Sequence, residues 1–380
     1  MLWLAVKTLF HEKVRLIITL IGITISTVLT LMEVSIYLGV MGDATAVIRN
    51  TDADIWIASK NIQSFDFALP FPEHRINQVR ALPDVLWAQK LFLSWGFLKL
   101  ANGGREQAQI IAYNPDNGIG APWAMLEGSA SDVKGGRYII MDKTSEQRLG
   151  KLNSGTLWEM TVGKDQYSFK LVGLSQGIKS FTTVPLVFMS YNQFKTLAQE
   201  IGWGDQTSFI VAKLSDPAKA DAVVKALRAT LRDNDIFTRD EFIHKTVMYW
   251  TVQTGMGMAF FLTAILAVLI GGAIVGQAIF ASTMEHLREY GTLKALGAKN
   301  SEIYFVIISQ AAISAAIGYA IGVIVILLTR GGMEQSGVSI YLSPILFITV
   351  FFIILLVCLL SAYFSVRKVR MLDPVTVFKG

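Results

Sequence analysis

The sequence is poor in the residues from which disulfides and metal sites are built. It has one cysteine and four histidines in 380 residues. Because Cys358 lies inside an apolar run, no disulfide within the chain is possible, and any soluble part must rely on its own hydrophobic core. His74 and His244 stand apart from other candidate ligands, and His286-Leu287-Arg288-Glu289 lacks the spacing of a zinc-binding helix. The sequence therefore predicts neither a metal site nor a catalytic cluster.

A nucleotide-binding loop is also missing. The phosphate loop GxxxxGK[ST] has no counterpart, since Gly150-Lys151 is followed by Leu152 and Ser145 stands where the first glycine belongs. We therefore expect no cofactor in this chain. If ATP and Mg take part in its activity, a partner chain binds them.

Charge is scarce as well, at 17% of residues, whereas hydrophobic residues make up 52%. This composition is too apolar for a typical soluble protein of this length and predicts contact with lipid. The net charge of +5 is compatible with nucleic-acid binding or with basic residues that orient membrane helices. The basic clusters flank the apolar runs, which favours the second interpretation.

Four apolar runs are long enough to cross about 30 Å of hydrocarbon. Glu33 is the sole charged residue in the first, and the other three have none; the runs are residues 16–38, 256–280, 304–328 and 345–364. A cleaved signal peptide is the alternative for the first run, because Ala44-Thr45-Ala46 resembles a cleavage site. The length of the run favours a membrane span.

Basic residues in short loops set the predicted orientation. They precede the first span, lie between the second and third, and follow the fourth, whereas the 329–344 loop contains Arg330 alone. We therefore expect both termini in the cytoplasm of a bacterial cell and residues 39–255 outside its inner membrane. Residues 1–15 fit an interfacial amphipathic helix, with Trp3, Val6 and Phe10 on its apolar side.

Residues 39–255 predict an α+β domain in two parts. At both ends the order is strand, helix, strand: residues 53–58, 73–82 and 85–100 at one end, and 207–214, 217–232 and 235–238 at the other. We expect these flanks to pair into one layer. Between them, residues 105–113, 138–141, 156–162, 167–174 and 184–190 predict short strands of a second, mostly β subdomain.

The loop between the second and third spans, residues 281–303, predicts a short helix. Met284, Leu287 and Tyr290 recur at a three-residue step, and Gly297 is placed to end the helix. The helix can lie on lipid headgroups or dock a partner protein, and periodicity alone leaves both open. The residues assigned to partner coupling are Met284, Glu285, Leu287, Arg288, Glu289, Tyr290, Leu293, Lys294, Gly297, Asp373 and Pro374.

Polar and small residues inside the spans predict helix packing. Gly272 with Gly276, and Gly318 with Gly322, form small-xxx-small patterns that serve packing within the chain or between two copies. Gln277 and Gln310 are predicted to hydrogen-bond between helices. For Glu33, near the outer end of its span, snorkelling toward water is favoured over a coupling role.

The residues after the second span also carry a resemblance to a known family. Arg288-Glu289-Tyr290-Gly291 followed by Lys294-Ala295-Leu296-Gly297-Ala298 resembles the motif of MacB/FtsX-type ABC transporter permeases, with Tyr290 where the family often has Ile. Arg370 to Val375 resembles the family's basic helix and Asp-Pro ending. The arrangement of one span, a large outer domain and three spans is likewise similar, so the resemblance covers the whole chain. The likeness is to stand-alone permeases of the DevC type, which have no fused ATPase domain.

The resemblance implies a fold, partners and an activity. The fold is a four-helix membrane unit with a MacB-like periplasmic core of porter-like and β-rich subdomains. The partners are an ABC ATPase, a second copy of the chain, a periplasmic adaptor and an outer-membrane channel. The activity is export of a lipid-like or hydrophobic substrate by mechanotransmission, in a subunit that is not itself an enzyme. The alternatives are an FtsX-like regulator that activates an envelope enzyme, which a smaller outer domain would favour, and a membrane-anchored enzyme, for which no polar cluster stands out.

The expected organisation divides the chain into nine segments. They are the amphipathic helix 1–15, span 16–38, outer domain 39–255, span 256–280, cytoplasmic coupling helix 281–303, span 304–328, outer loop 329–344, span 345–364 and cytoplasmic tail 365–380.

Overall fold

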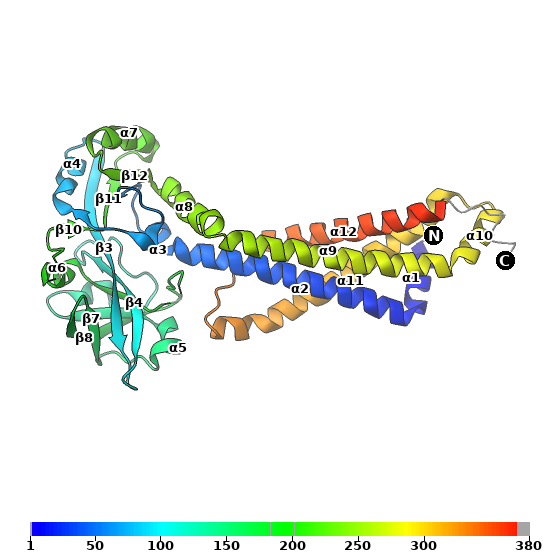
Figure 1. Cartoon of the computed structure of the whole chain (residues 1–380), viewed down its shortest axis with the longest axis horizontal. Helices are drawn as coiled ribbons and strands as arrows, with labels where there is room; N and C mark the ends of the chain where they lie inside the picture. Colours follow the sequence, from blue (N-terminus) through cyan, green and yellow to red (C-terminus); the bar gives the residue numbers. More distant parts are fainter. Residues whose placement is uncertain (1, 183, 201, 371–380) are drawn as a thin grey trace. The chain divides into compact units, whose positions relative to one another are not determined.

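The computed structural model describes residues 2–182, 184–200 and 202–370. The chain forms two compact units (Figure 1). Residues Met1–Gly39 and Met256–Gly380 form the first, which we call the membrane unit, and Val40–Gly255 form the second, the outer domain. The two units are described separately below.

The membrane unit is helical because its sequence consists of long apolar runs. Within the described residues, four helices are long and apolar enough to cross a membrane, as predicted. They are α2 (Lys13–Ala44), α9 (Met256–Glu285), α11 (Asn300–Gln335) and α12 (Pro344–Arg370). Two shorter helices, α1 (Leu2–His11) and α10 (Leu287–Ala295), lie at the same end of the bundle (Figure 1).

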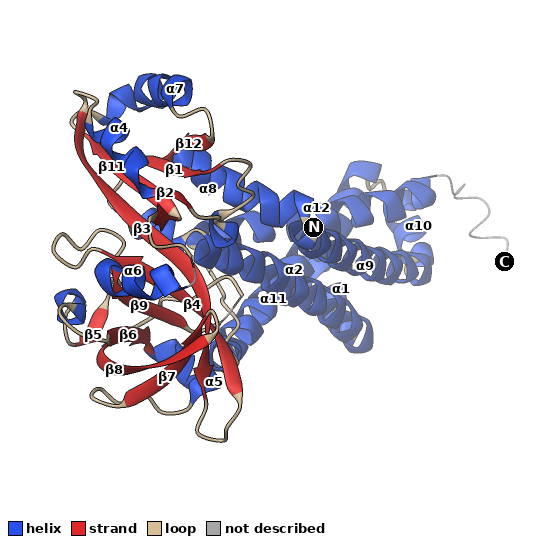
Figure 2. Cartoon of the chain, turned by 60° about the vertical axis from the view of Figure 1, so that its left-hand side comes forward, coloured by secondary structure: helices blue, strands red, loops and turns tan. Residues whose placement is uncertain are grey.

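The outer domain is built on one continuous mixed sheet, shown in Figure 2. The strand order is β12-β1-β11-β3-β4-β9-β6-β8-β5, and β7 pairs with both β3 and β8. The strands are β1 (Ile55–Ser59), β3 (Val85–Lys99), β4 (Arg105–Tyr113), β5 (Met125–Glu127), β6 (Tyr138–Asp142), β7 (Leu157–Val162), β8 (Asp165–Ser175), β9 (Leu186–Ser190), β11 (Phe209–Leu214) and β12 (Asn234–Thr238). The predicted flank strands do pair, with β1 between β11 and β12.

Strand β3 connects the two parts of this domain. Its first half pairs with β11 and its second half, from Phe92 to Lys99, pairs with β4. The flank strands therefore form one lobe and the predicted β-rich insertion forms the other, with β3 common to both. The predicted α+β fold class is confirmed.

Alternation along the strands divides the flank lobe into two cores. Ile55 and Ile57 of β1 face a core covered by α4 (Ile76–Arg80) and α7 (Ala220–Thr230), while Trp56 and Ala58 face the opposite core. This second core includes Phe242 of α8 (Arg239–Met248). In the β-rich lobe, α6 (Tyr191–Glu200) packs Phe194 and Leu197 into a third core.

The segment that leaves the outer domain differs from the prediction. Residues 239–254 contain no Gly or Pro, and this composition predicts a helix that continues into the second span. Instead α8 ends at Met248, a π-helical turn follows at Tyr249–Gln253, and Gly255 interrupts the path with a φ of +72° before α9 begins. The prediction was wrong because glycine reaches this left-handed conformation at little cost, and a helix ends there.

Candidate functional site

Helix α10 and its flanks form the part of the membrane unit to which the sequence assigned coupling. Helix α9 ends at Glu285, and α10 begins at Leu287 after His286. Gly297 adopts a φ of +100°, its N–H donates to the carbonyl of Lys294 at 3.0 Å, and the N–H of Ala298 donates to that of Leu293 at 2.9 Å. This pair of bonds is a Schellman motif, so Gly297 ends the helix as predicted.

One face of α10 is buried in the membrane unit. Tyr290 is 6% exposed and belongs to the bundle core, and Leu293 packs against that core. Burial raises the pKa of Tyr290 to about 12. The sequence assigned Tyr290 to partner coupling. In the structure its ring packs in the bundle core and fixes α10 to the bundle, and a role in coupling stays a prediction.

The opposite face of this region is open. The exposed fractions are 41% for Met284 and 81% for Leu296, and the side chains of Glu285 and Glu289 are about 68% and 70% exposed. Arg288 is also exposed, and Lys294 is half-buried. The side chain of Leu287, and the whole of Asp373 and Pro374, lie outside the described residues.

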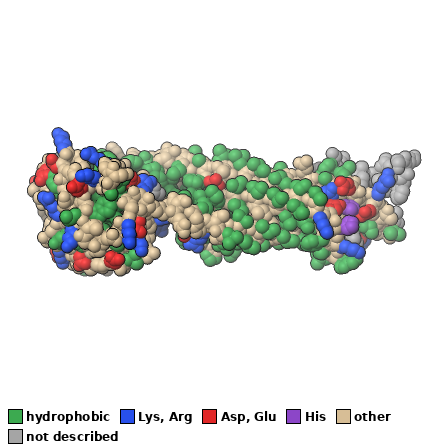
Figure 3. All heavy atoms as spheres, turned by 90° about the horizontal axis from the view of Figure 1, so that it is seen from below, with side chains coloured by type: hydrophobic (Ala, Val, Ile, Leu, Met, Phe, Trp, Pro, Cys, Tyr) green, Lys and Arg blue, Asp and Glu red, His purple; other side chains and the backbone are tan. Residues whose placement is uncertain are grey.

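A cluster of charged side chains joins this turn to the start of the chain. Glu12 lies between α1 and α2, and its carboxylate contacts Arg15, the Nε2 atom of His286 and the hydroxyl of Ser282. Arg15 also reaches Glu285 at 2.7 Å. Figure 3 shows basic, acidic and histidine side chains gathered at one end of the apolar bundle. We call Glu12, Arg15, Ser282, Glu285, His286 and Glu289 the junction cluster.

His286 is the titratable centre of the junction cluster. Burial alone would lower the pKa of its imidazole. Two carboxylates outweigh that effect by stabilising the protonated ring: Glu289 lies 3.0 Å from Nδ1, and Glu12 contacts Nε2. The pKa of His286 is therefore raised above its ordinary value. The protonated ring can donate to both carboxylates at once. Sequence reasoning missed this cluster because Glu12 and His286 are far apart in the chain and neither belongs to a local motif.

The glycine patterns pack helices within the chain. A Cβ atom on Gly272 would lie 2.5 Å from Val357 of α12, and Gly276 faces Ser361 of the same helix. A Cβ atom on Gly318 would lie 2.6 Å from Ile23, and one on Gly322 would lie 2.7 Å from Thr27, both on α2. Of the two uses left open by the sequence, the structure places both patterns in packing within one chain.

The intramembrane polar residues have different surroundings. Gln310 is 7% exposed and lines a small cavity next to Glu12 and Ser314. Gln277 is exposed, and it lines a groove of about 910 Å³ between α2 and α9. The predicted hydrogen bonds between helices stay a prediction for both glutamines. Glu33 is half-buried in α2, and its role stays a prediction.

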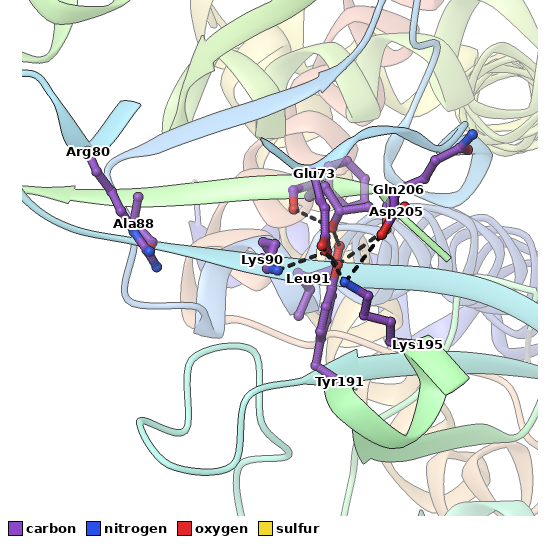
Figure 4. Close-up of polar contacts among 11 residues, drawn as sticks. Glu73, Arg80, Ala88, Lys90, Leu91, Tyr191, Lys195, Asp205 and Gln206 are labelled. Carbon is purple, nitrogen blue, oxygen red and sulfur yellow. Dashed lines mark hydrogen bonds and ion pairs between the residues drawn. The ribbon is translucent and has the colours of Figure 1, made fainter. Parts of the chain in front are cut away.

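The outer domain contains one dense polar cluster, shown in Figure 4. The carboxylate of Glu73 accepts from Lys90 at 2.8 Å, from the hydroxyl of Tyr191 at 3.1 Å and from Lys195. Burial would raise the pKa of Glu73, but the two lysines lower it below its ordinary value. The cluster ties the flank lobe, through Glu73, to α6 of the β-rich lobe. Both carboxylate oxygens are engaged, and no group of histidine, cysteine or acidic residues suited to a metal ion is found among the described residues.

Family models match both parts of the chain. The model described as MacB-like periplasmic core domain matches residues 16–230, and that described as FtsX-like permease C-terminal matches residues 261–374. An uncharacterized ABC transporter permease of Mycobacterium bovis is 21% identical over the full length of both chains. Another, of Methanocaldococcus jannaschii, is 21% identical over 99% of this chain and 96% of its own.

Proteins named MacB are among the more partial matches. The macrolide export ATP-binding/permease protein MacB of Campylobacter jejuni is 23% identical over 51% of this chain and 29% of its own length. The periplasmic region of MacB from Actinobacillus actinomycetemcomitans aligns with a TM-score of 0.38 at 15% identity, over 51% of this chain and 92% of that structure. The family models match more than half of the sequence and include both the outer domain and the last three spans. The chain belongs to the MacB/FtsX family of ABC transporter permeases.

Proposed function

We propose that this permease is the membrane subunit of an ABC exporter that couples ATP hydrolysis by a separate ATPase subunit to motion of its own outer domain. ATP and Mg then bind to the partner and not to this chain. The proposal extends to a lipid-like or hydrophobic cargo, a second copy of the chain, a periplasmic adaptor and an outer-membrane channel. Substrate is moved by the periplasmic domain through mechanotransmission and need not cross the bundle.

The location and orientation follow from the family and from charge. Four apolar helices in a permease of this family indicate an inner-membrane protein with a periplasmic domain. We infer that both termini face the cytoplasm, because Lys7, Lys13, Arg288 and Lys299 lie on the segments that would then be inside. In that orientation α1 and α10 face the cytoplasm together.

The observation that carries the proposal is the division of α10 into two faces. Tyr290 and Leu293 fix the helix to the bundle core, while Arg288 and Glu289 are exposed. Met284 at the end of α9 and Leu296 after α10 extend this exposed face. A displacement of α10 can reach the bundle through the packed face, because packed side chains and rigid helices carry energetic coupling between sites. The junction cluster adds a direct connection from this turn to α1 and α2. A partner that displaces α10 would thereby act on the first and second spans together.

The test is charge reversal on the open face. Glu289→Lys should weaken docking of the cognate ATPase and lower permease-stimulated ATP hydrolysis by on the order of tenfold, because a rim charge steers and orients a partner. MgATP turnover of the reconstituted complex is the measurement. Glu289→Gln, which removes the charge without reversing it, should give an intermediate loss.

The matched control is Glu334→Lys, the same charge change near the far end of α11, where Glu334 pairs with Arg330 at 2.7 Å. It should leave ATP turnover unchanged. Full stimulation in the Glu289→Lys complex would mean that α10 lies on the lipid surface and that coupling uses another segment. Normal turnover with activation of an envelope enzyme, and no substrate exported, would favour the FtsX-like regulator.

A further inference from the structure

The exit segment of the outer domain, residues 239–255, has an irregular backbone where it leaves the fold. Helix α8 runs to Met248, the π-helical turn Tyr249–Gln253 follows, and Gly255 has a φ of +72°. Single π-helical turns are rare and recur at functional sites, because they re-aim the side chains of one turn. Among the side chains that this turn presents to the domain is Trp250.

Trp250 is held between aromatic rings from two distant segments. The ring of Phe181 stacks on it with centroids 3.7 Å apart, and that of Phe67 lies 5.8 Å away. Tyr249 meets Phe67 edge-on at 5.7 Å. Aromatic pairs at these distances contribute beyond the apolar area that they bury. In the exit segment, Phe242 of α8 packs in the core of the outer domain, and beyond α8 Trp250 and Tyr249 attach the π-helical turn to it.

A buried carboxylate lies next to this indole. Asp66 is 5% exposed, and its Oδ1 accepts a hydrogen bond from the side-chain amide of Gln109 at 3.1 Å. Its Oδ2 and the Nε1 of Trp250 are both buried and lack a partner of normal geometry, although the indole is close enough to lower the pKa of the carboxyl. Burial is the larger effect and raises the pKa of Asp66 to about 6.

No ion pair balances this carboxylate among the described residues. The ionisable groups on the surrounding segments include Arg105 and Glu106 of β4, Lys179, and Arg239, Asp240, Glu241, His244, Lys245 and Tyr249 of the exit segment, and the ion pairs of the described residues join none of them to Asp66. The ammonium of Lys245 lies 5.5 Å from the ring of Phe237, and neither lysine pairs with Asp66. An ionised Asp66 is therefore a buried charge that hydrogen bonds alone must stabilise, and the free energy of the closed arrangement rises when the proton leaves.

We propose that Asp66, Gln109, Phe67, Phe181 and Trp250 form a clasp that fixes the exit segment to the outer domain, and that loss of the Asp66 proton loosens it. The sign follows from linkage: opening exposes Asp66 to water, where its pKa falls toward the ordinary value of 3.8, so the open form binds the proton more weakly. Acid therefore favours the closed clasp. Between pH 7.5 and pH 5 the ratio of closed to open forms should rise about tenfold.

Fluorine NMR of the full-length protein in lipid nanodiscs tests the clasp. The protein is labelled with 5-fluorotryptophan, and Trp250→Phe identifies the resonance of Trp250. That resonance should shift or sharpen as the pH falls, with an inflection near pH 6. Asp66→Asn, which keeps an acceptor for Gln109 but cannot ionise, should abolish the inflection. Asp165→Asn, at an exposed carboxyl, should leave it unchanged.

A second measurement needs no variant. Hydrogen exchange of the amides of residues 245–255, corrected for the chemical effect of pH on exchange, should slow by about tenfold from pH 7.5 to pH 5. The proposal would be overturned if neither the Trp250 resonance nor the exchange rate of the exit segment changed with pH. It would also be overturned if both kept their pH dependence in Asp66→Asn. Neither experiment involves the ATPase or transport, so failure of the clasp and failure of the proposed function can be told apart. A role of the clasp in coupling ATP hydrolysis to motion of the outer domain does rest on the proposed function.

Discussion

Gly318 shows how a single residue position sets the packing of the membrane unit. Its carbonyl accepts a hydrogen bond from the hydroxyl of Thr24 at 3.2 Å, and its missing side chain lets Ile23 of α2 lie directly against α11. Gly22 and Gly271 serve the contact of α2 with α9 in the same way. Lipid supplies no hydrophobic drive between helices, so close backbone approach of this kind is what holds α2 in the bundle.

Gly318→Ala should therefore destabilise the membrane unit. The added Cβ atom would lie 2.6 Å from the Cγ2 atom of Ile23, so one helix must move away. Overpacking of this kind costs about 1–3 kcal/mol. Thermal unfolding of the purified protein in nanodiscs measures the loss as a lower midpoint.

Gly331→Ala is the matched control for that substitution. Gly331 lies in the same helix, and a Cβ atom there has no neighbour within 4 Å. It should be neutral or slightly stabilising, because alanine is the better helix former. Equal midpoints for the two variants would show that the contact of Gly318 with α2 does not contribute to stability.

At the scale of elements, α10 depends on the junction cluster as well as on Tyr290. The pKa of His286 is raised in the folded protein because Glu289 and Glu12 favour the charged ring over the neutral one. A group of this kind contributes stability that is fully present below the unfolded pKa, about 6.5, and is lost as the pH rises through the higher folded value. The attachment of α1 and α2 to the turn before α10 should weaken in that window.

His286→Gln tests this pH dependence. Wild-type protein should be more stable than the variant by on the order of 1 kcal/mol near pH 6, a modest value because Glu289 is solvent-exposed. The difference should shrink as the pH rises above 6.5. Unfolding midpoints of both proteins across this pH range give the difference directly, and a constant difference would assign His286 a packing role without a charge effect.

Helices and strands with a clear hydrophobic periodicity could be predicted from the sequence. Features that depend on contacts between residues far apart in the chain could not. Residues 217–232 were expected to be helical and contain α7 (Ala220–Thr230), with Val223, Val224 and Leu227 buried at helical spacing. Helix α6, with Tyr191, Phe194 and Leu197 at helical spacing, was missed after the strand that precedes it. Burial of Tyr290 in the bundle could not be predicted, because an apolar helical face can pack inward or dock a partner, and periodicity is the same in both cases. The junction cluster and the clasp join residues far apart in the chain, so no local pattern marks them.

At the scale of the whole molecule, the proposed mechanism requires that the outer domain and α10 lie on opposite sides of the membrane. The family models cover both regions but do not orient the chain. Orientation is inferred from basic residues, since loops rich in Lys and Arg stay in the cytoplasm. The loop at 281–303 holds Arg288, Lys294 and Lys299, whereas the loop at 329–344 holds Arg330 alone. This asymmetry predicts which side each loop occupies.

Cysteine labelling of intact cells tests that orientation. In a Cys358→Ser background, Asn102→Cys in the outer domain should react with a membrane-impermeant maleimide, and Asn300→Cys at the start of α11 should react only after the cells are permeabilised. Both asparagines are exposed, so burial would not protect either thiol. Wild-type protein is the control, because Cys358 is 2% exposed and should stay unlabelled before denaturation. The reverse pattern, with Asn300→Cys labelled from outside, would place α10 in the periplasm, where no ATPase could reach it, and coupling through this helix would have to be abandoned.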